Sequence, residues 1–321
     1  MNRKVFGAEQ SDGRHSSVRR RESIRRYNPR LMNRTLIGLL CGLGAAAIWG
    51  GMYVVSKVVL EIIPPFALVS LRLLLGVGTL LIVLLIRGGA KIPHKQFLQV
   101  LGVGFVGYGI SLSLQFLGTK LSTAGNGSLV TSATPAFVLL FAWILLKEVI
   151  TPRRLIALLL ATLGVIAVID PRSARLDPGL FLGNILLVGA AVTWALYSVL
   201  VRKATQDLDV LPFTLIAFLG GLPVTVPVGA WELDMIGIGE ITVGVIGGIL
   251  FLGVISTALA MVLWNTAFAF LDASLASLTF FAQPVVGTLL GWWFLGEQIT
   301  PLFLLGGMLI GLGLIVSARE A

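Results

Sequence analysis

The sequence predicts an all-α membrane protein with ten transmembrane helices, arranged as two inverted five-helix repeats. Hydrophobic residues make up 56% of the 321 residues and charged residues only 12%, about half the charged share of soluble domains. Apolar stretches of roughly the 20 residues that a membrane-spanning helix needs recur along the chain. Two groups of residues also recur at nearly the same spacing in the two halves of the chain.

Ten apolar stretches fit into the chain because the loops between them are short. The fifth stretch is short, and Pro223 and Pro227 are expected to interrupt the seventh, which is tolerated only where neighbours satisfy the freed backbone groups. The expected spans are 35–56, 66–86, 97–118, 124–146, 154–169, 179–201, 211–230, 242–264, 274–295 and 301–318.

The basic residues indicate the orientation of these helices. A formal net charge of +9 is also typical of nucleic-acid-binding proteins, but here the positive residues follow the loops. With the N-terminus in the cytoplasm, 19 of the 24 Lys and Arg residues fall on the cytoplasmic side, four fall outside, and Arg72 lies within a helix. We therefore expect both termini in the cytoplasm and no nucleic-acid partner.

Residues 1–34 form a basic segment with few apolar residues. The triplet at 19–21 and the pair at 25–26 are arginines among Ser and Asn. We expect a disordered cytoplasmic tail that contacts anionic lipid. Met1 and Met32 begin the same Met-Asn-Arg triplet, so both are candidate translation starts.

Several kinds of chemistry lack the residues they need. Cys41 is the only cysteine, and the two histidines are His15 in the tail and His94 in a loop. We therefore expect no metal site, no cofactor and no Ser/His/Asp hydrolase. The GxGxxG pattern at 102–107 lies inside an apolar stretch with no preceding strand, so we interpret it as a close helix contact rather than a dinucleotide site. The same interpretation covers the GxxxG pairs Gly38/Gly42, Gly287/Gly291 and Gly307/Gly311.

The first repeat signal joins a proline to a glutamate. Pro135 stands thirteen residues before Glu148, and Pro284 stands thirteen residues before Glu297, near the ends of the expected fourth and ninth helices. Each glutamate is followed by x-Ile-Thr-Pro, and the offset between the two copies is 149 residues.

The second repeat signal is a tryptophan followed eight residues later by a basic residue. It occurs as Trp49 with Lys57 and as Trp194 with Arg202, at an offset of 145 residues. Five helices per half is an odd number, so the second copy enters the membrane from the opposite face. Many secondary transporters have this architecture, with a site near the midplane, although architecture alone does not fix function.

These residues, with the glycine-rich last span at 306–313, resemble the EamA family of the drug/metabolite transporter superfamily. The resemblance covers both halves, 35–170 and 179–318. It implies ten helices, residence in the plasma (inner) membrane of a bacterium or archaeon, and efflux of small metabolites or drugs, often amino acids. It does not identify the substrate.

Aromatic and polar side chains within the apolar stretches are candidates for a substrate cavity. Trp49 and Trp194 lie mid-helix, each with a tyrosine one turn on, and either line a cavity or simply pack. Arg72 either extends to the outer surface or pairs with a carboxylate. Hydrogen bonds between helices readily explain three uncharged polar residues in or beside the spans, Gln115, Asn126 and Asn184. Asn265 and Gln283 are better candidates for contact with a solute. The candidate cavity comprises Trp49, Tyr53, Arg72, Trp194, Tyr197, Asn265 and Gln283.

The two glutamates of the repeat are candidates for gating or coupling. Glu148 and Glu297 end helices, where the helix dipole disfavours negative charge, so a neighbouring cation is expected at each. The following Thr-Pro pairs predict new helices with Thr as the N-cap. A hinge or gate lock and a proton-coupling site are both consistent with these positions. The candidates are Pro135, Glu148, Pro284 and Glu297.

Together these features predict a secondary transporter, an exporter of small metabolites (amino acids or related compounds) or drugs, in which the two halves rock about a midplane cavity. Its expected partners are a small-molecule solute and membrane lipid, with protons as a candidate coupling ion, and it is expected to be a monomer or homodimer. A non-transporting scaffold or receptor is the first alternative. A membrane-embedded enzyme is a weaker one, because no Asp, Glu or His cluster lies within the spans.

Overall fold

The computed structural model describes residues 29–89, 94–122, 130–169, 178–295 and 301–319, and every regular element in these ranges is helical. Segments η1, η2 and η5 are π-helical, whereas η4 and η6 are 3₁₀-helical. In chain order the elements are α1 (Pro29–Leu60), α2 (Pro65–Ile86), α3 (His94–Gly104), η1 (Phe105–Ser111), α4 (Leu112–Leu121), α6 (Thr134–Phe141), η2 (Ala142–Leu146), α7 (Pro152–Ile169), η4 (Pro178–Leu180), α8 (Phe181–Ala204), α9 (Val210–Ile236), α10 (Val243–Leu250), η5 (Phe251–Leu259), α11 (Ala260–Phe270), α12 (Ala273–Leu278), η6 (Thr279–Phe281), α13 (Ala282–Leu295) and α14 (Pro301–Ala318).

Within the described ranges, six helices are long and apolar enough to cross a membrane. Large apolar side chains cover their outward faces: Ile86 is 81% exposed and Leu182 is 59% exposed. So much exposed apolar surface is stable only against lipid or a partner. The six helices are Asn33–Met52, Pro65–Ile86, Gln96–Leu121, Phe181–Ala204, Val210–Ile236 and Val243–Phe270.

The expected interruption of the seventh span is wrong. Pro223 and Pro227 both lie inside α9, which runs without a break from Val210 to Ile236. Proline is tolerated within transmembrane helices where neighbouring helices pack against the altered backbone. Helix α9 has such neighbours, because it contacts α2 and α3.

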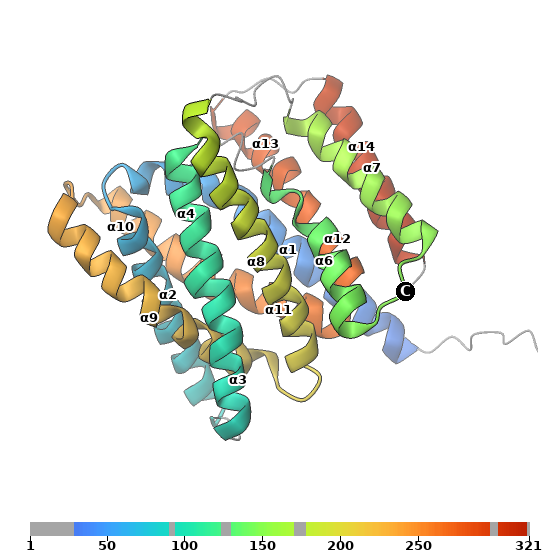
Figure 1. The fold of residues 1–321 in the computed structure, drawn as a ribbon, viewed down its shortest axis with the longest axis horizontal. Coiled ribbons are helices and arrows are strands. Elements are labelled where there is room, and N and C mark those ends of the chain that lie inside the picture. The colour runs from blue at the N-terminus through green and yellow to red at the C-terminus, as the bar shows by residue number, and fades with distance from the viewer. Residues whose placement is uncertain (1–28, 90–93, 123–129, 170–177, 296–300, 320–321) are drawn as a thin grey trace, which may run out of the picture.

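The helices pack in pairs that join early and late parts of the chain. Helix α2 lies along α9, α1 lies along α11 and α13, and α8 lies along α4 and α6. Helices α7 and α14 form a further pair at one edge of the bundle, as Figure 1 shows. The main hydrophobic core therefore forms between elements that are distant in sequence.

Glycines allow α3 and α9 to approach closely. A Cβ atom added at Gly104 would lie 1.9 Å from the carbonyl oxygen of Ala217, and one at Gly220 would lie 2.2 Å from that of Leu101. The structure thus confirms the expected close helix contact for Gly104 and Gly107 of the 102–107 pattern, but not for Gly102, where an added Cβ would meet nothing within 4 Å among the described residues. It does not support such a contact at Gly307 and Gly311, because an added Cβ would meet nothing within 4 Å among the described residues.

We expect Gly104→Ala to destabilise the protein by about 1–3 kcal/mol, because the methyl group would overpack a contact made by backbone. Gly102→Ala is the matched control, since the same methyl group meets open space two residues away on the same helix. Thermal unfolding of both variants in detergent measures the difference. Equal melting temperatures would contradict the packing described here.

Candidate functional site

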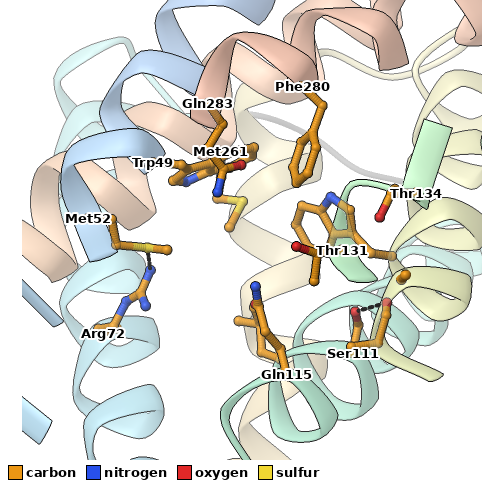
Figure 2. A pocket seen from close by; sticks show the side chains of 14 residues that line it. Trp49, Met52, Arg72, Ser111, Gln115, Thr131, Thr134, Met261, Phe280 and Gln283 are labelled. Atoms are coloured by element: carbon orange, nitrogen blue, oxygen red, sulfur yellow. Dashed lines mark hydrogen bonds between the residues drawn. The ribbon is translucent and has the colours of Figure 1, made fainter. Parts of the chain in front are cut away.

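A cavity lies inside the bundle, between α1, α2, α4, α6, α8, α11 and α13 (Figure 2). The space open to the centres of water-sized spheres is about 40 Å³, enough for a few water molecules. Apolar side chains form most of the wall, and amides and hydroxyls interrupt it. The lining residues are Trp49, Met52, Arg72, Ser111, Leu112, Gln115, Thr131, Thr134, Ala190, Ala191, Trp194, Met261, Phe280 and Gln283.

The two repeat tryptophans meet in this cavity although 145 residues separate them. The ring centroids of Trp49 and Trp194 lie 6.0 Å apart with the planes at 77°, an edge-to-face contact. The indole nitrogen of Trp49 donates to the carbonyl oxygen of Ser256 at 3.0 Å. The indole nitrogen of Trp194 is buried and has no hydrogen-bond partner among the described residues.

The π-helical segment η5 makes the Trp49 contact available. In a regular α-helix the N–H of Ala260 would bond to the carbonyl of Ser256. Here that N–H donates to the carbonyls of Ile255 and Thr257 instead. The Ser256 carbonyl can therefore accept from the indole, which is consistent with the frequent occurrence of π segments at functional sites.

Arg72 is buried within the bundle, 3% exposed, and does not extend along α2 to the surface. Its Nε donates to Thr257 Oγ1 at 3.1 Å, and its Nη2 lies 3.3 Å from Met52 Sδ and 3.4 Å from Ser256 Oγ. The guanidinium carbon also lies 5.5 Å from the ring centroid of Phe116, within the range of cation–π attraction. These contacts hold a positive charge at the cavity wall.

Two other predicted cavity residues lie outside the lining. Tyr197 and Asn265 belong to a buried network in which the Tyr108 and Tyr197 hydroxyls share a hydrogen bond. Tyr197 donates to Asn265 Oδ1 at 3.0 Å, and Asn265 Nδ2 donates to Thr214 Oγ1 at 2.9 Å. The network ties α8, α9 and α11 to η1, next to the cavity. The side chain of Tyr53 lies outside the described residues.

The cavity also contains residues that the sequence does not single out. Gln115 is one of several uncharged polar residues in apolar spans, and Ser111, Thr131 and Thr134 carry no signal of their own. Small hydroxyls are common in membrane helices and often bond to a backbone carbonyl of their own helix, so nothing in one sequence distinguishes those that face a cavity. Of the predicted set, Trp49, Arg72, Trp194 and Gln283 line it.

A cluster of charged residues lies at one end of the bundle. We call these residues, Glu148, Arg154, Arg202 and Asp272, the ion cluster. Arg154 bridges Glu148 at 3.3 Å and Asp272 at 2.7 Å. Arg202 lies 3.8 Å from Asp272 and donates to the Ala269 carbonyl at 2.7 Å. The cluster therefore connects the start of α7 and the end of α8 to the segment between α11 and α12.

Glu148 has a second function in this cluster. Its carboxylate accepts from the backbone N–H of Ala273 at 2.8 Å and of Ser274 at 3.2 Å, and from the Ser274 hydroxyl at 2.6 Å. It thus caps the start of α12, where backbone N–H groups lack partners within the helix. The cation expected beside Glu148 is Arg154, whose own backbone N–H bonds to Thr151 Oγ1 at 3.2 Å, as expected for a Thr N-cap.

The remaining gate candidates lie as follows. Pro135 is in the first turn of α6, and Pro284 is likewise near the start of α13, whereas the sequence pattern placed both near the ends of helices. Both positions suit proline, whose missing N–H costs little in a first turn. Pro135 lines a small cavity of about 10 Å³ beside Arg154 and Ser274. Glu297 lies outside the described residues.

A larger hollow of about 470 Å³ opens at the opposite end of the bundle, around the segment between α1 and α2 and the ends of α4 and α9. Phe116 lines this hollow and contacts Arg72, which lines the central cavity. The Phe116 ring therefore stands between the two spaces. The ion cluster and this hollow thus lie at opposite ends of the bundle.

The fold and site define an all-α integral membrane protein with an internal cavity lined by indoles, amides and one cation. The model of the EamA-like transporter family matches residues 36–169 and again residues 181–319. The chain belongs to the EamA-like transporter family.

Known proteins resemble this chain over most of its length. The uncharacterized transporter YoaV of Bacillus subtilis is 24% identical, over 89% of this chain and 97% of its own. An uncharacterized transporter of Archaeoglobus fulgidus is 28% identical, over 85% of this chain and 95% of its own. A chain of known crystal structure superimposes with a TM-score of 0.75 at 21% identity, covering 88% of this chain and 99% of that one, which indicates a shared fold.

Proposed function

We propose that this protein is a secondary transporter that exports small metabolites (amino acids or related compounds) or drugs from a prokaryotic cell through its inner membrane. The observation that carries the proposal is the buried cavity, in which Trp49 and Trp194 from distant parts of the chain meet beside Arg72 and Gln283. A wall of apolar groups interrupted by a few polar ones is typical of a small-molecule site. The space of about 40 Å³ must widen when a solute enters.

We further propose ten transmembrane helices in two inverted halves, 35–170 and 179–318. The two separate family matches support this division. The pairing of helices also supports it. In the proposed repeat α1 is equivalent to α8, and α4 is equivalent to α11, so the contact of α1 with α11 has its counterpart in the contact of α8 with α4. The pairs α2 with α9 and α7 with α14 each join two equivalent helices. Because of this symmetry, the cavity can be closed towards one side of the membrane and, after the two halves rock, closed towards the other side.

The ion cluster serves in this proposal as the cytoplasmic gate. It joins Glu148 and Arg154 of the first half to Arg202 and Asp272 of the second, so it must break when that side opens. Phe116, between the hollow and Arg72, serves as the outer gate. The described conformation then corresponds to a state closed towards the cytoplasm.

The proposed topology predicts the result of reporter fusions. Fusions at residues 90 and 150 are expected to be active as cytoplasmic reporters, and fusions at 174 and 235 as external phosphatase reporters. A phosphatase-active fusion at 150 would overturn the inverted repeat, because this topology puts the segment between the fourth and fifth helices in the cytoplasm.

Flux in proteoliposomes tests the function itself. We expect the purified full chain to move at least one member of a panel of amino acids, nucleosides, organic acids and cationic dyes, with and without a proton gradient. A non-transporting scaffold or receptor predicts no flux for any solute and tight binding of a protein partner. A gradient that accelerates flux would identify protons as the coupling ion.

A further inference from the structure

We propose that the central cavity recognises a small organic anion, a monocarboxylate with an apolar body, and not an organic cation. This inference rests on the proposed function and names the class of its substrate. Three properties of the wall carry it: its charge, its hydrogen-bond donors, and the packing of its aromatic rings.

The charge of the wall is positive. Among the described residues that line the cavity, Arg72 is the only one with an ionised side chain, and none is Asp or Glu. A guanidinium stays protonated in proteins and presents its N–H groups in a planar fork that matches a carboxylate. The contacts with Thr257 and Ser256 are among those that hold this group in place.

The hydrogen-bonding groups around the same space include several donors. The buried indole N–H of Trp194 has no partner among the described residues. Figure 2 shows the amides of Gln115 and Gln283 pointing into the cavity from opposite sides, and each amide carries two N–H donors. The Gln283 Oε1 is also without a partner in the described part of the chain, so this amide has an acceptor left for a water or a hydroxyl. An acceptor-rich ligand matches this set of donors best.

The aromatic rings are poorly arranged for a cation. A cation binds over an open ring face, but these rings contact one another. Trp194 has Tyr197 at 4.9 Å and Tyr108 at 6.2 Å between centroids. Trp49 has Trp264 at 5.3 Å and Phe280 at 6.2 Å. With the methionines, leucine and alanines of the lining, the rings of Trp49, Trp194 and Phe280 form the apolar part of the wall.

Three ligands with one apolar body test the proposal: phenylacetate, phenylacetamide and phenethylamine. Their binding to the purified full chain in nanodiscs can be measured by calorimetry. We expect phenylacetate to bind about tenfold or more tightly than the other two, as a charge-assisted hydrogen bond implies. Equal or tighter binding of the amide or the amine, or no binding of any of the three, would overturn the proposal.

A matched pair of variants tests the role of Arg72. We expect Arg72→Gln to weaken phenylacetate binding about tenfold or more and to leave phenylacetamide binding unchanged. Arg87→Gln is the control, because Arg87 is exposed and directly follows the same helix. Equal losses for both ligands in Arg72→Gln would count against the proposal. If Arg72→Gln does not fold, the comparison of ligands on the unaltered chain decides alone.

Flux measurements separate this inference from the proposed function. Binding of phenylacetate without flux of any solute would keep the ligand class and overturn transport. Flux of an amine that Arg72→Gln does not alter would keep transport and overturn the ligand class.

Discussion

Arg154→Gln is expected to open the ion-cluster end of the protein. Arg154 contacts both Glu148 and Asp272, and the side chains of Arg154 and Glu148 are only 14% and 12% exposed. Hydrogen bonds between ionised groups with little water around them contribute about 2 kcal/mol, so losing them shifts the balance between the two gate states about thirtyfold. A thiol-specific reagent applied from that side should therefore label Ser317→Cys, near the small cavity behind the gate, much faster.

Arg153→Gln is the matched control, because this neighbouring arginine is exposed. In Arg153→Gln, the labelling rate of Ser317→Cys should be the same as in the protein with Arg153 unaltered. Equal rates in both variants would rule out the ion cluster as a gate.

Glu148→Gln distinguishes the two roles considered for the glutamate. A gate lock predicts faster labelling of Ser317→Cys, whereas a proton carrier predicts loss of pH-driven flux with solute exchange retained.

Cysteine labelling of α8 should distinguish the cavity wall from buried helix contacts. Ala191 lines the cavity, whereas Ala195, one turn further along the same helix, is equally buried and does not line it. In a Cys41→Ser background, we expect Ala191→Cys to react with a membrane-permeant polar thiol reagent about tenfold or more faster than Ala195→Cys, because access limits thiol reactivity. Excess solute should slow the reaction at 191 alone.

These positions are better labelling sites than Tyr197, since Tyr197 is fully buried in the hydrogen-bonded network with Tyr108. Equal rates at 191 and 195 would mean that the wall is closed to polar solutes. The binding site would then have to be sought in the hollow around Phe116.

The internal repeat explains why the tryptophan pair is predictable from the sequence. In the proposed inverted repeat, a position at the membrane midplane in one half is equivalent to a position at the midplane in the other, so the repeat alone predicts that the mid-helix residues Trp49 and Trp194 lie at one level. Residues three positions apart lie on the same face of a helix, so Tyr197 is expected beside Trp194. Their ring centroids lie 4.9 Å apart. What a single helix cannot indicate is that the Tyr197 hydroxyl bonds with Tyr108 and Asn265 from other helices.

The ion cluster shows the same limit. The position of Glu148 at a helix end predicts a cation nearby, and Arg154, six residues further along the chain, is that cation. The Thr-Pro pair predicts an N-cap at Thr151, and the Thr151 hydroxyl accepts from the backbone N–H of Arg154. Asp272 and the start of α12 lie more than a hundred residues away, so their approach depends on the packing of α7, α8 and α12. The sequence pattern marks Arg154 only as a sign of orientation, and it marks Arg202 as a sign of orientation and as a part of the repeat. Neither observation considers the partners of these residues.

The π-helical segment η5 makes the number of residues in α10–α11 as important as their identity. Deleting one residue between Phe251 and Leu259 would let the backbone return to a regular α-helix, because a π-helical segment accommodates one extra residue. The Ser256 carbonyl would then bond within its own helix and be lost to Trp49. A one-codon deletion in this stretch should thus be far less tolerated than most single substitutions there.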